Sequence, residues 1–243
     1  MLTFAFITLG ATACSGPRAV TGVAWLPDTA GWELREVDEQ EPPRWVAYHR
    51  DVDHAPAKEI RVIGIVNGSP DVVAKIMRTR LLDDSKLPDG MQRKILSASD
   101  STVEYWAMSD MPWPLNDREG HERLRFSQTS TTGARRIEAV SYVPDTPPTP
   151  GTVRVALVEN QFDFIPTKDG RSVVDMKSLH DMGGNFPNWV IYGFVSDFMV
   201  EELEALDDAV PAEGPIAACV NDERRSATAD NLSLDGCVAL ILR

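Results

Sequence analysis

Basic residues are scarce in this chain of 243 residues, and acidic residues outnumber them. There are 24 Lys and Arg against 37 Asp and Glu, which gives a formal net charge of -13 at pH 7. Binding to nucleic acid requires a basic face that neutralises phosphates, and the sequence has no dense cluster of Lys and Arg. We therefore expect no nucleic acid partner, and attraction to an anionic membrane surface is disfavoured for the same reason.

Cysteine is equally scarce. Cys14, Cys219 and Cys237 are the three cysteines, and none lies in a CxxC pair or beside a cluster of histidines. We therefore predict no zinc site. Once Cys14 is set aside, Cys219 and Cys237 are an even pair that could form a disulfide in an oxidising compartment. This bond would stabilise the C-terminal tail by about 3 kcal/mol.

The common catalytic motifs are missing. The sequence has no G-x-S-x-G nucleophile elbow, no H-E-x-x-H, no P-loop and no G-x-G-x-x-G after a strand. The segment His49–His54 (HRDVDH) has the residue types of metal ligands, but in a strand its last histidine would face away from the others, which favours a solvated turn. His180 could act as a general base, yet no positioned nucleophile accompanies it. We expect no metal, no cofactor and no enzymatic activity.

The apolar run at the N-terminus, Leu2–Leu9, is too short to cross a bilayer as a helix. It indicates an export signal over residues 1–13, and Ala11–Cys14 resembles a bacterial lipobox, in which the cysteine is lipidated and becomes the new N-terminus. By resemblance to Gram-negative lipoproteins, Ser15 after the cysteine implies the outer membrane. We therefore expect a periplasmic protein tethered through Cys14, followed by a linker over 14–30. The alternative is a buried strand or helix with an incidental thiol.

The rest of the chain predicts an α+β domain built on an antiparallel sheet. Gly31–Glu41 is compatible with a short helix or a turn, and strands are expected at Arg44–Arg50 and Ile60–Val66. Ser69, Pro70 and Asp71 are typical of a helix start, and the apolar spacing predicts that this helix ends near Leu82. Six further strands are predicted: Met91–Ser97, Thr102–Ser109, His121–Thr129, Arg135–Val143, Thr152–Ile165 and Ser172–Asp181. Their short links exclude a parallel sheet with helical crossovers.

A long helix is predicted after Pro187, with apolar residues at helical spacing up to Leu206. Beyond Pro211 the tail is rich in Ala, Gly, Ser and Asp, and Val238–Leu242 could add an edge strand.

Large apolar side chains are concentrated on the predicted sheet and on this helix. Methionine and aromatic rings suit an adaptable apolar pocket, although such stripes are more often a packed core. The candidates for a pocket lining are Trp106, Met108, Trp113, Phe126, Phe162, Phe164, Met176, Met182, Phe186, Trp189, Phe194 and Phe198.

The segment Tyr105–Glu119 (YWAMSDMPWPLNDRE) resembles the signature of the START (steroidogenic acute regulatory protein-related lipid transfer) domain family. In that signature an aromatic-rich strand leads into Pro-aromatic-Pro and then Arg-Asp, whereas here Arg118 is followed by Glu119. The resemblance extends over residues 31–209, with Gly31–Leu34 at its beginning and Gly184–Trp189 before its last helix, and leaves 210–243 as a tail.

This resemblance implies a helix-grip fold, in which a curved antiparallel sheet wraps the C-terminal helix around an internal hydrophobic cavity. It implies a monomer that binds a hydrophobic small molecule, a lipid in particular, and carries or senses it. Arg118 would then hold the polar head of the ligand or form a structural salt bridge. Two alternatives remain: a cavity enzyme of the same fold, such as a polyketide cyclase or aromatase, and an envelope lipoprotein with a solid core that acts as an interaction partner.

Overall fold

The computed structural model of the protein describes residues 26–129, 131–184, 186 and 188–210, and for Asn188, Trp189 and Tyr192 it describes the backbone only. Several predictions lie outside these residues. They are the export signal (1–13), the lipidation site Cys14, the disulfide between Cys219 and Cys237, and an edge strand at Val238–Leu242.

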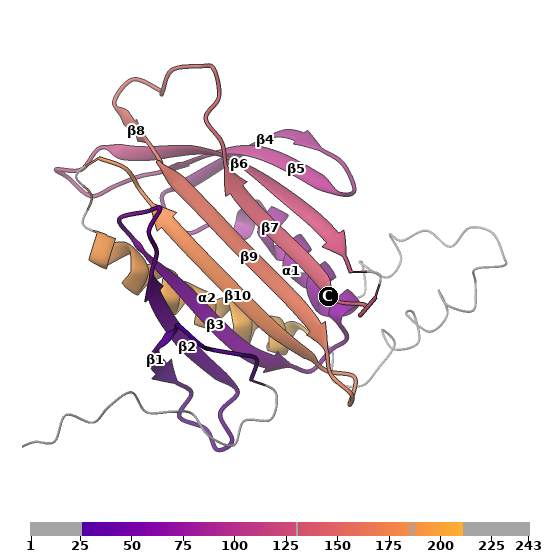
Figure 1. The fold of residues 1–243 in the computed structure, drawn as a ribbon. Helices are drawn as coiled ribbons and strands as arrows, with labels where there is room; N and C mark the ends of the chain where they lie inside the picture. Colours follow the sequence, from indigo (N-terminus) through magenta and orange to yellow (C-terminus); the bar gives the residue numbers. More distant parts are fainter. Residues whose placement is uncertain (1–25, 130, 185, 187, 211–243) are drawn as a thin grey trace, which may run out of the picture.

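A single sheet of ten strands dominates the described part of the chain (Figure 1). The strands are β1 (Glu33–Val37), β2 (Trp45–Asp51), β3 (Lys58–Val66), β4 (Met91–Ala98), β5 (Thr102–Ser109), β6 (Asp117–Gln128), β7 (Arg135–Ser141), β8 (Thr152–Arg154), β9 (Leu157–Pro166) and β10 (Ser172–Asp181). Their order is β1-β2-β3-β10-β9-β7-β6-β5-β4, and all these neighbours are antiparallel, as the short links predicted.

Two of the predicted elements differ in kind from the structure, and the strand expected at His121–Thr129 begins at Asp117 instead. Residues 33–37 form β1, an edge strand on β2, where a short helix or turn was expected. The predicted strand Thr152–Ile165 is two strands. The backbone amide of Val155 donates to the backbone carbonyl of Glu119 on β6, whereas the amide of Ala156 donates to that of Asp181 on β10. β8 therefore pairs with β6 in parallel, and β9 continues the antiparallel ladder.

The first helix, α1, covers Pro70–Leu82 as predicted and is followed by the short 3₁₀ helix η1 (Asp84–Lys86). Ser69 takes the extended conformation of an N-cap, Pro70 has the backbone angle that suits a first helical residue, and Asp71 lies near the positive end of the helix dipole. The buried side of α1, with Val73, Ile76 and Met77, faces the sheet. The apolar spacing in the sequence thus gave the correct buried face.

The second helix, α2 (Asn188–Ala209), crosses the same face of the sheet as α1 (Figure 1). Val195, Met199, Leu203 and Leu206 are buried against the strands, mainly β3 and β10. The approach is close at Gly64 of β3, since a Cβ built there would lie 2.3 Å from Cδ2 of Leu203. Glycine in the middle of this strand is therefore explained by the close packing of the helix.

The opposite face of the sheet has a smaller apolar cluster around Val46, Tyr48, Ile63 and Val173, packed by residues of β1 and of the segment before it. We call the face under the helices the helix-side face and the other the outer face. Neither described helix has the length and apolarity needed to cross a membrane.

Candidate ligand-binding site

The helix-side face is apolar across its middle. One cross-strand row there runs through Phe126, Ile137, Phe162, Met176 and Val62. Of the residues predicted to line a pocket, Phe162, Phe164 and Met176 are buried in the main core, and Phe126 is partly buried beneath Arg78 of α1. This part of the face is a packed core against the two helices, which was the alternative interpretation of the aromatic stripe.

Nearer the beginning of β6 the same face becomes polar. Tyr105 and Glu122 are opposite each other on β5 and β6, and Tyr105 Oη donates to Glu122 Oε2 at 2.5 Å. Burial raises the pKa of Glu122, and burial together with the Glu122 carboxylate raises the pKa of Tyr105 well above its ordinary value. Burial therefore disfavours the charged form of this carboxyl group, which has Tyr105 as its hydrogen-bond partner.

A second polar group lies on β9 and β10. The side chain of Asn160 joins Ser178 and His180, because Ser178 Oγ donates to Asn160 Oδ1 at 2.6 Å and His180 Nε2 lies 3.0 Å from the same oxygen. Burial lowers the pKa of His180 to about 4, so its ring is neutral at pH 7. A neutral ring in contact with a carbonyl oxygen must donate through Nε2, which leaves Nδ1 as an acceptor.

His180 and Ser178 border a hollow between the sheet and the first half of α2. It has a volume of about 180 Å³, including the part that is open to solvent, and Ile60, Lys58, Ile191 and Val195 are also in its lining. Pockets that enclose a drug-sized ligand usually measure about 300–1,000 Å³. Almost none of this volume is wide enough for a water molecule, so the described residues leave no space for a ligand between the sheet and α2 at this point.

Two aromatic side chains of α2 are exposed beside this region. Phe194 and Phe198 stack on each other with ring centroids 6.4 Å apart, and 57% and 41% of their surfaces are accessible. They lie eight and four residues before Glu202, whose carboxylate accepts two hydrogen bonds from Arg80 of α1. The spacing of four puts all three side chains on one flank of α2, the flank that faces α1.

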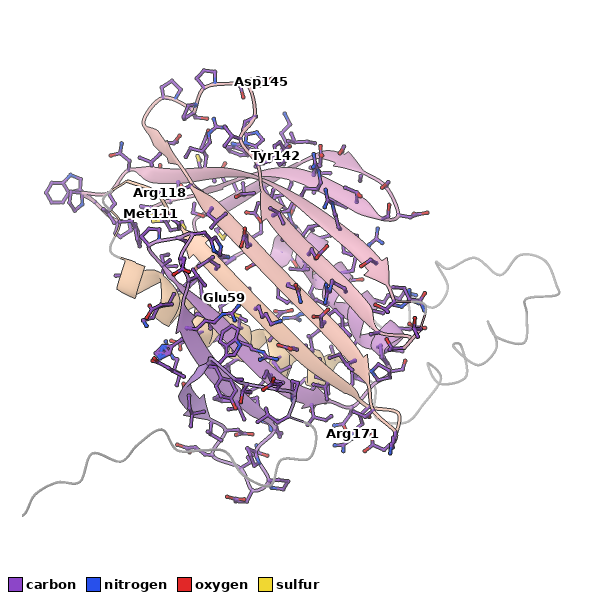
Figure 2. The ribbon with its side chains drawn as sticks, in the orientation of Figure 1. Glu59, Met111, Arg118, Tyr142, Asp145 and Arg171 are labelled. Carbon is purple, nitrogen blue, oxygen red and sulfur yellow. The ribbon has the colours of Figure 1, made fainter. Side chains whose placement is uncertain are left out.

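Arg118 is buried at the beginning of β6, where it holds the segment before α2. Its guanidinium donates to the backbone carbonyls of Asn116, Met182 and Gly183. The guanidinium carbon, Cζ, lies 5.3 Å from the centre of the Phe186 ring. Figure 2 shows Arg118 and Met111 at the same end of the sheet, with Arg171 at the opposite end. Arg118 thus anchors a loop through carbonyls, and no carboxylate is among its partners in the described part of the chain, so the expected salt bridge is not seen there, while its contact with a ligand stays a prediction.

Three of the expected pocket residues lie away from the helix-side face. Trp106 and Met108 point to the outer face, because in β5 the alternate residues Val103 and Tyr105 face the helices. The indole of Trp106 approaches Glu119 Oε2 at 3.4 Å on that outer side. Trp113, in the loop between β5 and β6, is 92% exposed.

The remaining candidates lie close to the beginning of α2. Met182 is buried and Phe186 is half-buried, both in the segment that Arg118 holds, and the side chain of Trp189 lies outside the described part of the chain. Their role in binding stays a prediction.

The polar groups of the helix-side face were missed by sequence reasoning, apart from His180. A signal for Glu122 was present: it lies in the register of Leu124 and Phe126, so an acidic residue occupies the apolar side of an alternating strand. No comparable signal exists for Asn160 and Ser178, because their contact depends on the register between β9 and β10.

The histidine and acidic residues of the segment 49–54 bind to separate partners. His49 lies 3.3 Å from Glu33, Asp51 contacts Lys58 at 2.9 Å, and His54 lies 3.3 Å from Glu159 on β9. Within residues 26–210 as described, no three His, Cys, Asp or Glu side chains are grouped as metal ligands would be.

Neither the family models nor the curated proteins contain a match to this chain, whereas solved structures do. The STAR-related lipid transfer protein from Xanthomonas axonopodis is 23% identical, covers 73% of this chain and 97% of its own, and superposes with a TM-score of 0.60. Human StAR-related lipid transfer protein 5 is 19% identical over 75% of this chain and 88% of its own, with a TM-score of 0.58.

A third similar structure is the lipid transfer and protein localization domain of human StarD13, with 20% identity, a TM-score of 0.56, and coverage of 75% of this chain and 90% of that domain. At these identities the similarity concerns the fold, and it agrees with the open antiparallel sheet and the long last helix described above. The chain has the START-like helix-grip fold that the Tyr105–Glu119 segment predicted.

Proposed function

We propose that this protein binds a hydrophobic small molecule, a lipid in particular, on the helix side of its sheet, along the flank of α2 that faces α1. The observation that carries the proposal is the stacked, exposed pair Phe194 and Phe198 on the flank of α2 that faces α1. Large apolar side chains left open to water on a helix that otherwise buries its apolar residues favour an apolar partner. The lipid transfer proteins with a similar fold support the same class of ligand.

The proposed ligand has an apolar body and a polar end. Apolar surface contributes roughly 25 cal/mol for each Å² removed from water, so an acyl chain or ring system against Phe194 and Phe198 supplies most of the affinity. The polar end would lie near the hollow beside His180, which would have to widen on binding because almost none of its volume admits a water molecule.

We propose carriage or sensing of the ligand without a chemical step. Glu122 and His180 have shifted pKa values, as catalytic groups often do, but each already has a neighbouring side chain as a hydrogen-bond partner, Tyr105 and Asn160 respectively. These contacts account for both groups as fixed polar parts of the face. A change in the mass of a bound ligand during incubation would contradict this part of the proposal.

We also propose that the protein is exported and anchored to the outer membrane through Cys14, on the sequence pattern alone. Labelling cells with radioactive palmitate tests the anchor. The label should appear on the wild-type chain and be lost in Cys14→Ala. Incorporation that persists in the variant would contradict a lipid at this cysteine.

Ligand binding is tested by native mass spectrometry of protein purified from its own host, which should show a co-purifying apolar molecule. Transfer of a fluorescent lipid from neutral phosphatidylcholine vesicles should fall at least tenfold when both Phe194→Asp and Phe198→Asp are introduced. Stability should change less than for a core substitution, because 57% of the surface of Phe194 and 41% of that of Phe198 are exposed. Val143→Asp is the matched control, since Val143 is 78% exposed in the loop after β7. Equal transfer by all three proteins would overturn the proposed site.

A further inference from the structure

The two helices lie side by side over only part of their length. α1 begins beside the end of α2, because a Cβ built on Gly68 would lie 3.1 Å from Val210 as well as from Val73. The last turn of α1 reaches Glu202, whose carboxylate accepts hydrogen bonds from Arg80 Nε and Nη2 at 2.6 and 2.9 Å. The helices are therefore antiparallel. α1 ends just after this pair, whereas α2 extends past it toward its own beginning.

Side chains on this flank of α2 are progressively less covered toward the beginning of the helix. Leu206 is fully buried, and the side chain of Glu202 is 12% exposed. Phe198 and Phe194, the next two residues in this row, are the exposed pair described above. The spacing of four residues puts each side chain one turn from the next. The open apolar flank therefore starts one turn beyond the ion pair, and Phe194 lies about 12 Å along the helix from Glu202.

The ion pair closes this flank at one end. Arg80 and Glu202 belong to different helices and both side chains are mostly buried, so the pair bridges the space between α1 and α2. Both oxygens of the carboxylate are occupied by the guanidinium, which leaves little capacity for the polar end of a ligand. Separating two mostly buried charges is unfavourable, and an apolar chain offers nothing in exchange. A chain that lies against Phe198 would therefore have to end at the pair.

Building on the proposed function, we infer that the ion pair of Arg80 and Glu202 is the closed end of the lipid site and limits the length of the chain that binds. The methyl end of the chain lies against Phe198 and meets the pair, and the polar end lies toward the beginning of α2. Arg80 and Glu202 are therefore specificity-determining residues, which select by length and make no bond to the polar end. Chains that fit gain affinity with every carbon, whereas longer chains gain none.

A series of 1-monoacylglycerols with chains from octanoyl to stearoyl tests this inference. The fluorescent apolar compound N-phenyl-1-naphthylamine is bound first and is then displaced by each member of the series. In the wild-type protein each added CH₂ group should tighten binding by roughly fourfold, as expected for its removal from water, up to a limiting length. Beyond that length the gain should vanish, because the end of the chain meets the ion pair. A gain that continues unchanged to stearoyl would overturn the inference while leaving lipid binding intact.

Removal of the ion pair should extend the limit. Arg80→Ala combined with Glu202→Ala removes both charges, so neither is left unpaired, and the limiting chain should become longer by at least one member of the series. Glu201→Ala is the matched control, because Glu201 is exposed beside Glu202 on the same helix, and it should keep the wild-type limit. The exchanged pair, Arg80→Glu with Glu202→Arg, should restore the limit, which a purely structural role of the pair would not explain. An unchanged limit in the folded double alanine variant would overturn the role of the pair.

A measurement on the unaltered protein covers the case in which a variant does not fold. A monoacylglycerol with a diazirine at the methyl end of its chain is bound and irradiated, and the labelled peptides are identified by mass spectrometry. The label should appear on the last turn of α1 and on residues 198–202 of α2. A label found elsewhere would contradict the inferred orientation of the chain. No displacement of the fluorescent compound by any member of the series would instead overturn the proposed function.

Discussion

At the scale of single residues, the outer face contains a buried ion pair with a testable energetic role. Arg61 of β3 donates to both carboxylate oxygens of Asp175 on β10, at 2.8 and 2.7 Å, and both residues are about 5% exposed. Asp175→Ala should lower the free energy of unfolding by about 3–5 kcal/mol, because it leaves a buried charge unpaired. Urea denaturation measures this. Asp163→Ala, which breaks a pair with the more exposed Arg136, should cost only about 1 kcal/mol. Equal losses in the two variants would contradict the argument.

Single residues are also where the sequence was least informative about the site. The prediction of a pocket lining relied on residue type, so it took Trp106 and Met108 together with Phe126, although strand alternation separates them onto opposite faces. Applying that alternation to β5 would have selected Tyr105 instead. The contact between Asn160 and His180 could not be predicted, because it joins two strands whose register depends on the folded sheet.

At the scale of elements, the segment before α2 depends on a glycine. Gly183 has a φ of +71°, and a Cβ there would lie 2.8 Å from the carbonyl oxygen of Arg154. Gly183→Ala should therefore destabilise the fold by about 2–3 kcal/mol, through the strained backbone and the clash together. Gly170→Ala is the control, because its φ is +85° with no atom within 4 Å of the added Cβ, and it should cost about 1 kcal/mol. The two thermal unfolding midpoints compare them, and a smaller loss at Gly183 would contradict the clash.

Elements were predicted well where local signals were strong. The Ser69-Pro70-Asp71 start and the apolar spacing gave α1, and the spacing in 191–206 gave α2. The breaks that were missed have nonlocal causes. β8 separates from β9 because the backbone amides of Val155 and Ala156 donate to the backbone carbonyls of Glu119 on β6 and Asp181 on β10. β1 forms because it pairs with the free edge of β2. Neither cause is visible in a local pattern of apolar residues.

At the scale of the whole molecule, stability should fall as the pH is lowered from about 6.5 to about 4. Burial lowers the pKa of His180 to about 4 in the folded protein, against 6.5 when it is exposed, so the unfolded chain binds the extra proton in this interval. Stability that is complete above pH 6.5 is then lost progressively, by about 2–4 kcal/mol at pH 4. The pKa values of His49 and His121 are also lowered by burial and add to the same trend.

Urea midpoints between pH 4 and 7.5 measure how steeply stability changes with pH, and His180→Leu should flatten this dependence. An equal slope in this variant would mean that the pKa of His180 is not lowered in the folded protein.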